Sequence, residues 1–413
     1  MTLRKSNAPV NNILGYLRET HVIFLILSLL FGTLFVFIVP PFQVPDETTH
    51  FLRIYSLSKG KLYYNTLDTS GSVQIDMPQG ILKVFHAVNH LPFNPGNKIS
   101  FKKDLWPMFF ASENKTEPFL LKDVTAVKYY HFLGYLLPAI VVKISELCHL
   151  PHYLILIAAR CANLALYSTV IYYAVKIVPF GKWIFACLTL LPMSLFLGAS
   201  LSYDAYSIAL SFLVVALFLH WALEGTVVDS AFLKKYCFIS FLLSTIKPAY
   251  AFLIGLYLII PARSARSNKD YFLYFFTGIV ILFVSEMAWV TQVWKIPGHL
   301  DGINSHGQLM WIVSHPISFI AVLIKSIFRG HLIKEFVGVL GWLDTQLSLP
   351  VYITSLTILL LATVFSGGSR MSLMQNLILV MVGMAITGVI LSLIHISEPT
   401  RPLYISYAVF CLK

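Results

Sequence analysis

Charged residues are scarce in this sequence. Only 12% of its 413 residues are Asp, Glu, Lys or Arg, whereas 57% are hydrophobic. Soluble domains carry about 25% charged residues, so a chain of this length has too little polar surface to stay dissolved in water. The composition therefore excludes an ordinary soluble protein and predicts an integral membrane protein.

Cysteine pairs and the motifs of common catalysts are also missing. The five cysteines show no CxxC or Cys/His spacing, so neither a disulfide framework nor a zinc site is expected. No HExxH, Walker A or GxSxG motif occurs, which argues against ATP-driven transport and the common hydrolases. The net charge is +11, but the basic residues flank apolar segments instead of sharing one face. They indicate contact with membrane lipids and their phosphates, and no nucleic acid partner.

Long apolar runs are abundant and predict an all-α, polytopic membrane protein. Residues 22 to 39 are just long enough to cross a bilayer, and the basic residues before them place the N-terminus in the cytoplasm. The further spans expected are 153 to 175, 183 to 199, 205 to 223, 271 to 290, 350 to 366 and 371 to 394.

Two hydrophobic segments depart from this simple pattern. Pro138, Lys143 and Glu146 interrupt residues 130 to 147, which favours a re-entrant or interfacial segment, although a full crossing remains an alternative. Residues 236 to 260 have basic residues at both ends and Lys247-Pro248 in the middle, a pattern that predicts two half-helices.

The remaining segments complete a single membrane domain, residues 1 to 391. The polar stretches 41 to 128 and 291 to 349 are expected to be outer loops that carry short interfacial helices rather than compact domains. Ser392 to Leu403 resembles a translated sequencing adaptor, so residues 392 to 413 are expected to be a non-native tail.

The strongest chemical signal follows the first span. Asp46, Glu47, His50 and Arg53 lie within the sequence PPFQVPDETTH and the residues just after it, on a helix expected over residues 46 to 59. A general base, a metal ligand and a phosphate-binding cation could all come from this segment. The alternative is that Asp46 only caps a solvated interfacial helix.

A second acidic group is expected on the same side of the membrane. The short basic loop 176 to 182 should be cytoplasmic, which leaves Ser200 to Asp204 outside. Asp204 then lies at the mouth of the cavity that holds Asp46, unless it serves only as a helix cap.

Several other charges and rings are candidates. Lys247 and Arg160 lie in apolar runs, where a charge is either functional or snorkels to the interface. In the second loop, Trp342 is a candidate interfacial anchor and Asp344 an exposed carboxylate. The basic stretch Lys325, Arg329, His331 and Lys334 favours an amphipathic helix on the leaflet, whereas single histidines such as His306 and His315 are interpreted as structural.

These blocks together resemble a known family. PPFQVPDETTH with Arg53, ARCAN at 159 to 163, PFGKW at 179 to 183, SLSYDA at 200 to 205, Lys247-Pro248-Ala249-Tyr250, His315-Pro316 and GWLDT at 341 to 345 are similar, in order, to landmarks of the bacterial membrane family catalogued as domain of unknown function 2142. The resemblance covers about residues 20 to 366. Such proteins are in turn similar to GT-C fold glycosyltransferases.

The resemblance implies a multi-pass protein of the bacterial inner (plasma) membrane that transfers a sugar outside the cytoplasm. The implied donor is a polyprenyl-phosphate sugar, and the acceptor a cell-envelope glycan or a lipid-linked molecule. Asp46 is the expected general base, and Glu47 is the alternative base or a ligand for a divalent metal ion. Asp204 is expected to position the acceptor or to help hold a cation. The residues expected to bind substrate, among them the cations that clamp the donor phosphate, are His50, Arg53, Arg160, Tyr203, Lys247 and Asp344.

Two alternatives remain open at this stage. A flippase or transporter of a lipid-linked glycan would cluster its ionisable residues along a central cavity open to both sides, whereas a transferase should gather Asp46 and Asp204 in one outward cavity. A glycan polymerase with a lipid-diphosphate donor is the third reading of the sequence.

Overall fold

The computed structural model describes residues 15, 17–63, 73–110, 115–121, 130–293, 305–319, 321, 331–366 and 371–397, and most of them are helical. Four described helices are long and apolar enough to cross a membrane: α2 (Thr20–Ile38), α7 (His152–Ile177), α10 (Asp204–Leu223) and α12 (Asn268–Val293). They match four of the expected spans. The prediction of an all-α membrane protein is therefore confirmed.

Shorter helices and two small sheets complete the described fold. The other helices are α3 (Glu47–Ser58), α4 (Gln79–Val88), α6 (Leu133–Leu147), α8 (Lys182–Thr189), α9 (Pro192–Gly198), α11 (Ser230–Ser244), α13 (Ser305–Ser314), α15 (His331–Val337), α16 (Leu349–Phe365) and α17 (Leu373–Ser397). The π and 3-10 turns are η1 (Phe101–Leu105), η2 (Trp106–Phe109), η3 (Pro248–Ile259) and η4 (Ala262–Ser264). The strands are β1 (Val73–Pro78), β2 (Thr116–Leu121), β3 (Val339–Leu340) and β4 (Thr345–Gln346).

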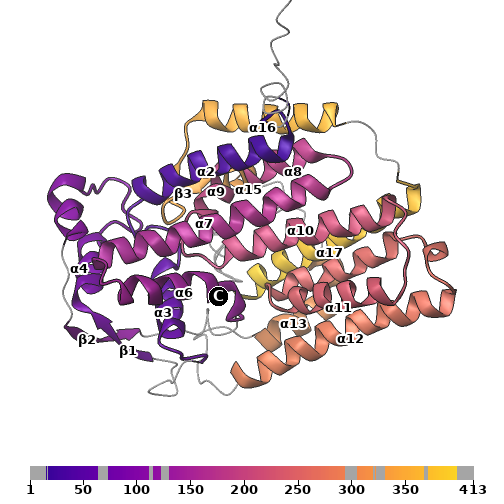
Figure 1. Cartoon of the computed structure of the whole chain (residues 1–413), viewed down its shortest axis with the longest axis horizontal. Coiled ribbons are helices and arrows are strands. Elements are labelled where there is room, and N and C mark those ends of the chain that lie inside the picture. Colours follow the sequence, from indigo (N-terminus) through magenta and orange to yellow (C-terminus); the bar gives the residue numbers. More distant parts are fainter. Residues whose placement is uncertain are drawn as a thin grey trace, which may run out of the picture.

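Helix α7 is the centre of the fold. It packs against α2, α6 and α10, and Figure 1 shows it running between them. The buried hydroxyls of Ser28 on α2 and Ser168 on α7 lie 2.7 Å apart. Gly32 permits this close approach, because a Cβ there would lie 2.4 Å from Leu164. Small and hydroxyl residues join membrane helices in the same way, by packing and by interhelical hydrogen bonds.

The expected span over residues 183 to 199 is wrong. The chain there forms two short helices, α8 and α9, separated by Leu190 and Leu191. Pro192 opens α9, and a proline cannot continue a helix because it lacks the N–H and clashes with the preceding turn. The carbonyl of Thr189, at the end of α8, instead accepts a hydrogen bond of 2.6 Å from the Tyr167 hydroxyl.

The predicted break at Lys247-Pro248 is confirmed. Helix α11 ends at Ser244, and the chain continues after Lys247 as the 3-10 segment η3. Helix α6 has 15 residues, fewer than the roughly 20 needed to cross a bilayer. Its length is consistent with the expectation that residues 130 to 147 do not form a full crossing, and its place in the membrane stays a prediction.

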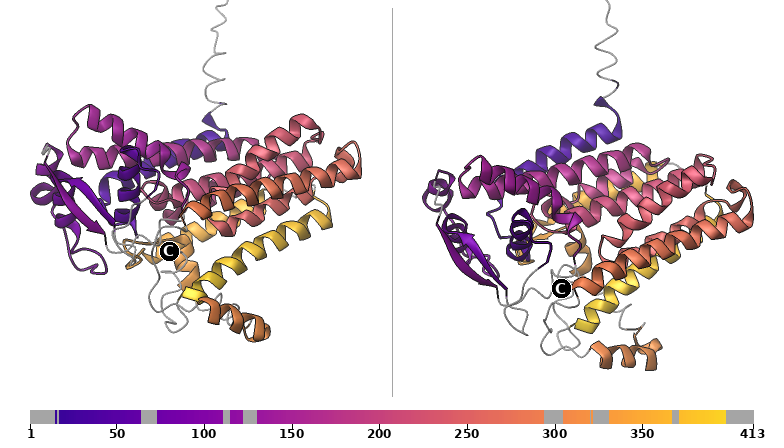
Figure 2. Two further views of the ribbon diagram at one scale, coloured as in Figure 1. Left: turned by 90° about the horizontal axis from the view of Figure 1, so that it is seen from below. Right: turned by 60° about the horizontal axis from the view of Figure 1, so that its bottom comes forward.

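The first polar loop, residues 41 to 128, is more compact than expected. Strands β1 and β2 pair antiparallel, with Val73 opposite Leu121, and α4 follows β1 directly. Residues of β1 are alternately buried and exposed, as in a strand with one face on a core. That face shares one hydrophobic core with α3, α6 and α7. The expectation of interfacial helices without a compact unit is therefore wrong here, and Figure 2 shows the sheet at one end of the molecule.

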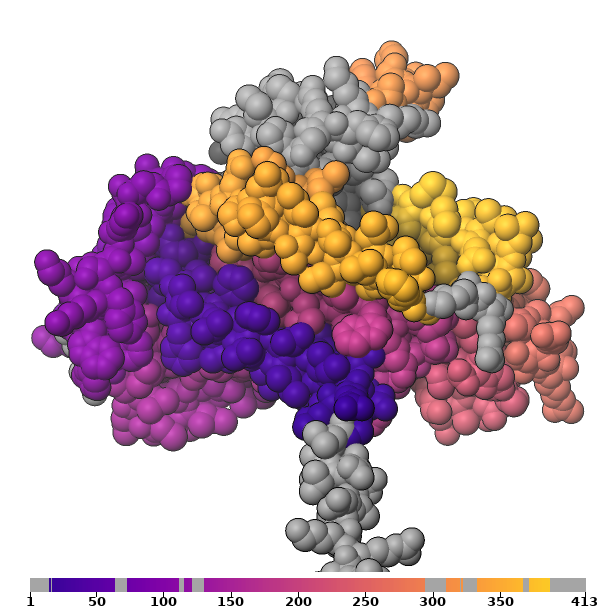
Figure 3. Space-filling model, turned by 90° about the horizontal axis from the view of Figure 1, so that it is seen from above, coloured from indigo at the N-terminus to yellow at the C-terminus, as the bar shows by residue number. Residues whose placement is uncertain are grey.

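The second polar loop, residues 291 to 349, is described in part. Lys325 and Arg329 of its basic stretch lie outside the described residues, whereas Lys334 lies on α15. Helix α15 packs on α9 and α16, and α16 packs on α8. Figure 3 shows α16, in orange, on the same face of the molecule as α2, in indigo. The second loop is thus joined to the membrane helices next to the end of the first span.

Candidate functional site

The loop between α2 and α3 has an unusual backbone. Phe42 and Asp46 both have positive φ, 65° and 58°, in the left-handed region. Aspartate tolerates that region, but a bulky residue such as Phe42 rarely adopts it. Such conformations persist only where the surroundings enforce them, and they gather at functional sites. The carboxylate of Glu47 supplies part of that enforcement, because Oε2 accepts a 2.7 Å hydrogen bond from the Phe42 N–H.

Glu47 and Arg160 form a completely buried ion pair. The carboxylate is 0% exposed and the guanidinium side chain 1%. Arg160 donates to Glu47 through Nε at 2.8 Å and Nη2 at 2.6 Å. Its other N–H groups donate hydrogen bonds to carbonyl oxygens at the end of α2, those of Val36, Val39 and Pro40. All five donors of the guanidinium are therefore used within the protein.

The same carboxylate joins the first loop to the SLSYDA block. Oε1 of Glu47 also accepts a hydrogen bond of 3.1 Å from the Leu201 N–H. Asn163, on α7, donates to the Ser200 carbonyl at 2.8 Å. Helix α7 thus holds both loops through Arg160 and Asn163. The two most specific blocks of the sequence lie side by side.

Asp204 and Lys247 form the second buried ion pair. The Lys247 Nζ lies 2.6 Å from Asp204 Oδ1, and their side chains are 8% and 13% exposed. The ammonium also lies 5.6 Å from the centre of the Tyr130 ring, within range of a cation–π contact. Asp204 is in the first turn of α10, where the cap position belongs to Tyr203. The alternative that Asp204 serves only as the helix cap is therefore wrong.

His50 connects the two halves of this cluster. Its Nδ1 lies 2.7 Å from the Tyr135 hydroxyl, and its ring stacks on Tyr130 at 5.8 Å. Burial lowers the pKa of His50 to about 4, against the opposing effect of the negative charges of Asp46 and Asp204. His50 is thus neutral at pH 7. Because the charges of Asp46 and Asp204 both act to raise the pKa of His50, both carboxylates lie near this histidine.

Tyrosines surround the Asp204–Lys247 pair. Tyr203 stacks on Tyr130, with ring centres 4.7 Å apart and planes 9° from parallel, and its hydroxyl donates to the Thr245 carbonyl. The Thr245 hydroxyl lies 2.6 Å from that of Tyr206. Gly134 permits α6 to approach, because a Cβ there would lie 2.3 Å from the Tyr203 ring. Sequence reasoning identified Tyr203 but missed Tyr130, Tyr135 and Thr245, which carry no motif.

Two candidate residues point to other parts of the fold. The buried guanidinium of Arg53 donates to the carbonyls of Lys61, at 3.3 Å, and Leu62, beyond the C-terminal end of α3. Asp344 accepts a 3.0 Å hydrogen bond from Thr345.

The GWLDT block contributes by supporting the first loop. Trp342 donates a hydrogen bond of 3.3 Å from Nε1 to the Phe42 carbonyl, and its ring lies 5.2 Å from Phe93. Leu343 packs beside Val44 in the same core cluster. Trp342 is half-buried against the protein, and its role as an interfacial anchor stays a prediction.

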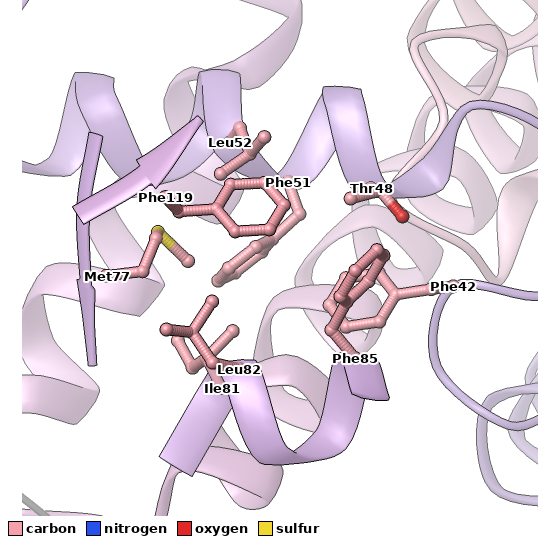
Figure 4. A pocket seen from close by; sticks show the side chains of 9 residues that line it. All are labelled: Phe42, Thr48, Phe51, Leu52, Met77, Ile81, Leu82, Phe85 and Phe119. Atoms are coloured by element: carbon pink, nitrogen blue, oxygen red, sulfur yellow. The ribbon is translucent and has the colours of Figure 1, made fainter. Parts of the chain in front are cut away.

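A small apolar cavity lies next to the loop between α2 and α3, since Phe42 is one of its lining residues. Figure 4 shows it between α3, α4 and the β1–β2 sheet, with Phe42 and Thr48 at one end and Met77 and Phe119 at the other. Its lining is completed by Phe51, Leu52, Ile81, Leu82 and Phe85. Thr48 brings the one side-chain hydroxyl to an otherwise apolar lining.

The expected metal-binding role of Glu47 finds no support. Both oxygens of Glu47 are engaged by Arg160 and by backbone N–H groups. In the part of the chain that the structure describes, no three His, Cys, Asp or Glu side chains are grouped closely enough to hold an ion.

One comparison with known proteins gave a match. A family model described as "Predicted membrane protein (DUF2142)" matches residues 29–401. No curated protein and no solved structure matches the chain.

Proposed function

Because the chain belongs to the DUF2142 family of membrane proteins, and because its Asp46 loop and Asp204–Lys247 pair converge on His50, we propose that it is a membrane glycosyltransferase. The donor is a sugar carried on polyprenyl phosphate, and the acceptor is a hydroxyl of a cell-envelope glycan or a lipid-linked molecule. The reaction takes place at the extracytoplasmic face of a bacterial inner membrane. The observation that carries the proposal is the convergence of these two segments.

The reaction needs little from the protein beyond a base, a cation and alignment. The acceptor oxygen forms a bond to the anomeric carbon while its proton passes to a carboxylate. The bond from that carbon to the phosphate oxygen breaks, and polyprenyl phosphate leaves with the electron pair. A positioned base contributes about 10²- to 10⁴-fold to such a step, and a cation in a site of low dielectric stabilises the leaving phosphate.

Asp46 is the base in this proposal. Its side chain is half-buried, next to the fully buried Glu47. Two hydrogen bonds fix the chain around the left-handed backbone of Asp46. Glu47 accepts one from the Phe42 N–H, and Arg160 donates the other to the Val39 carbonyl at the end of α2. Glu47 and Arg160, which the sequence suggested as alternative base and phosphate clamp, therefore act as positioning residues for Asp46.

Lys247 is the cation that meets the donor phosphate. It is largely buried, and in the unliganded protein its charge is balanced by Asp204. A phosphate can share the ammonium with Asp204, because Lys has three donor protons. Asp204 then sets the position of Lys247, and the Tyr130 ring confines it from the other side.

The decisive experiment is sugar transfer by the purified full chain in proteoliposomes. The donors are a panel of polyprenyl-phosphate monosaccharides, and consumption of each donor is followed. We expect Asp46→Asn to lose about 10²- to 10⁴-fold in rate while folding normally. Asp76→Asn, which changes an exposed carboxylate on β1, is the matched control and should keep its rate. Transfer at the wild-type rate by Asp46→Asn would reject the base, and donor translocation without consumption would identify a flippase instead.

A further inference from the structure

A short turn in the first polar loop carries three exposed aromatic side chains. It contains η1 and η2, which follow one another directly from Phe101 to Phe109. Phe101, Trp106 and Phe110 are all exposed, Phe110 most of all at 69%. The ring centres of Phe101 and Trp106 lie 6.0 Å apart, and those of Trp106 and Phe110 lie 5.3 Å apart. The three rings therefore form one continuous apolar patch on the surface.

The inner side of this turn is packed on the protein. Leu105 is buried in the core cluster around α3, α6 and α7. The Phe109 ring lies 4.3 Å from the ring of Tyr153, in the first turn of α7. The Ser100 N–H donates a hydrogen bond of 2.7 Å to the Asp104 carboxylate, which fixes the start of η1. Since Leu105 and Phe109 already fill the inner side, the exposed rings are held on the outside.

The contact with α7 places the turn at the level of a membrane surface. Helix α7 is one of the described helices that are long and apolar enough to cross a bilayer. Its 26 residues span roughly 39 Å, whereas the hydrocarbon core of a bilayer is about 30 Å thick. The first turn of α7, where Tyr153 meets Phe109, therefore reaches the headgroup layer of one leaflet.

The surface of α6 continues this apolar region. Ile140, Ile144 and Leu147 follow one another at spacings of four and three residues, which places them on one face of the helix, and all three are exposed. Leu147 is the last residue of α6, and α7 begins at His152. The exposed apolar face of α6 therefore extends to the same end of α7 as the aromatic patch, as the lipid-facing surface of a membrane protein would.

Lysines accompany the aromatic rings. Lys102 and Lys103 are exposed within η1, and Lys98 is exposed just before it. Tryptophan is enriched at membrane interfaces, because its ring is apolar and its N–H is polar. Lysine binds phosphate as a point charge, and basic residues near a membrane surface attract anionic lipids. Apolar rings next to lysines thus match the boundary between headgroups and acyl chains, whereas an apolar protein partner would leave the lysines unused.

We propose that the turn of residues 100 to 110 inserts into the headgroup layer of the leaflet beside the first turn of α7. The rings of Phe101, Trp106 and Phe110 reach the upper part of the acyl chains. Lys102 and Lys103 bind the phosphates of anionic lipids. The turn thus anchors the first polar loop, which also carries Asp46, to the membrane surface. This inference does not depend on the proposed function.

The test reads the surroundings of Trp106 in a bilayer. The full chain and Trp106→Phe are reconstituted in vesicles of phosphatidylcholine and phosphatidylglycerol in equal parts. The chain has seven tryptophans, so the emission of Trp106 is the difference between the two proteins. We expect lipids brominated near the headgroup end of their acyl chains to quench most of this difference, and dissolved acrylamide to quench little of it. Phe110→Trp adds a second probe at the most exposed ring without replacing Trp106, and its added emission should be quenched in the same way.

A second measurement tests the lysines. The double variant Lys102→Gln with Lys103→Gln should lower the quenching by brominated phosphatidylglycerol, relative to brominated phosphatidylcholine, by about twofold or more. Lys115→Gln is the matched control, because Lys115 is exposed in the same loop, directly before β2. It should leave the ratio unchanged. A ratio that is also unchanged in the double variant would remove the lysines from the lipid contact.

Two results would overturn the anchor. Quenching of Trp106 by acrylamide and not by brominated lipid would show that the turn faces water. Quenching by neither would show that another protein segment or a second copy covers the patch. Because Trp106→Phe keeps an aromatic ring at an exposed position, it should unfold at the wild-type temperature. Sugar transfer is not part of this test, so a negative result leaves the transferase proposal in place.

Discussion

The buried pair of Glu47 and Arg160 leads to a prediction that separates two adjacent acids. Glu47→Gln keeps the size of the side chain but removes its charge. Four hydrogen bonds converge on the carboxylate, from the N–H groups of Phe42 and Leu201 and from two nitrogens of Arg160. An amide has one oxygen and a nitrogen that only donates. Because each oxygen of Glu47 accepts two of the four hydrogen bonds, two of these donors would face another donor.

The expected loss is large because both members of the pair are buried. Breaking a buried ion pair by removing one partner costs about 3–5 kcal/mol, since the remaining charge is left uncompensated. Asp46→Asn, one position earlier, affects a half-buried side chain and should change the free energy of unfolding by about 1 kcal/mol or less. Glu47→Gln is therefore a stability variant, whereas Asp46→Asn is an activity variant.

The assay is equilibrium unfolding of the purified protein in mixed micelles, with wild type, Glu47→Gln, Arg160→Met and the double variant. The double variant should be more stable than the sum of the single losses predicts, by at least about 1 kcal/mol, because neither charge is then left alone. If Glu47→Gln lowered the free energy of unfolding by less than about 1 kcal/mol, or if the losses of the two single variants were additive, the ion pair would not stabilise the fold as we describe.

Two further predictions concern charge. Lys247→Met should lower the free energy of unfolding by about 3–5 kcal/mol, because Asp204 loses the ammonium 2.6 Å away. The double variant Lys247→Met with Asp204→Leu should recover most of that loss while staying inactive. Unchanged stability of Lys247→Met in the same unfolding assay would contradict the ion pair. The second concerns acid. The pKa values of His50 and His131 are lowered to about 4 by burial, so the unfolded chain binds more protons than the native one between about pH 6.5 and pH 4. Stability should therefore fall as the pH decreases through that window, by up to about 3 kcal/mol for His50, and a pH series of unfolding curves should show a shallower fall for His50→Gln; an equal slope would place His50 in solvent.

Much of the architecture followed from local signals in the sequence. Apolar length defined the spans that became α2, α7, α10 and α12, because a bilayer requires about 20 apolar residues from each crossing helix. The interruption at Lys247-Pro248 was equally local, since proline ends a helix whatever its neighbours are. The break at Pro192 carried the same signal, but it lay inside an apolar run and was missed.

The sheet of the first loop was not predicted because its two strands are far apart in the sequence. Val73 pairs with Leu121. The apolar and polar residues of β1 do alternate, but only over six residues, and its partner strand lies about 40 residues later. Their pairing depends on a core that α3, α6 and α7 also build.

The sequence by itself determined the membrane class of this protein and most of the residues at its candidate site, because composition, apolar length and short motifs are local properties. Only the tertiary structure decided which charge faces which. Arg160 meets Glu47, and Lys247 meets Asp204. The sequence offered both cations as phosphate ligands, whereas packing satisfies every donor of Arg160 within the protein and leaves Lys247 with a single carboxylate. The physical reason is that a buried charge takes its partner from whichever helix packs against it, and that choice is made by the whole core.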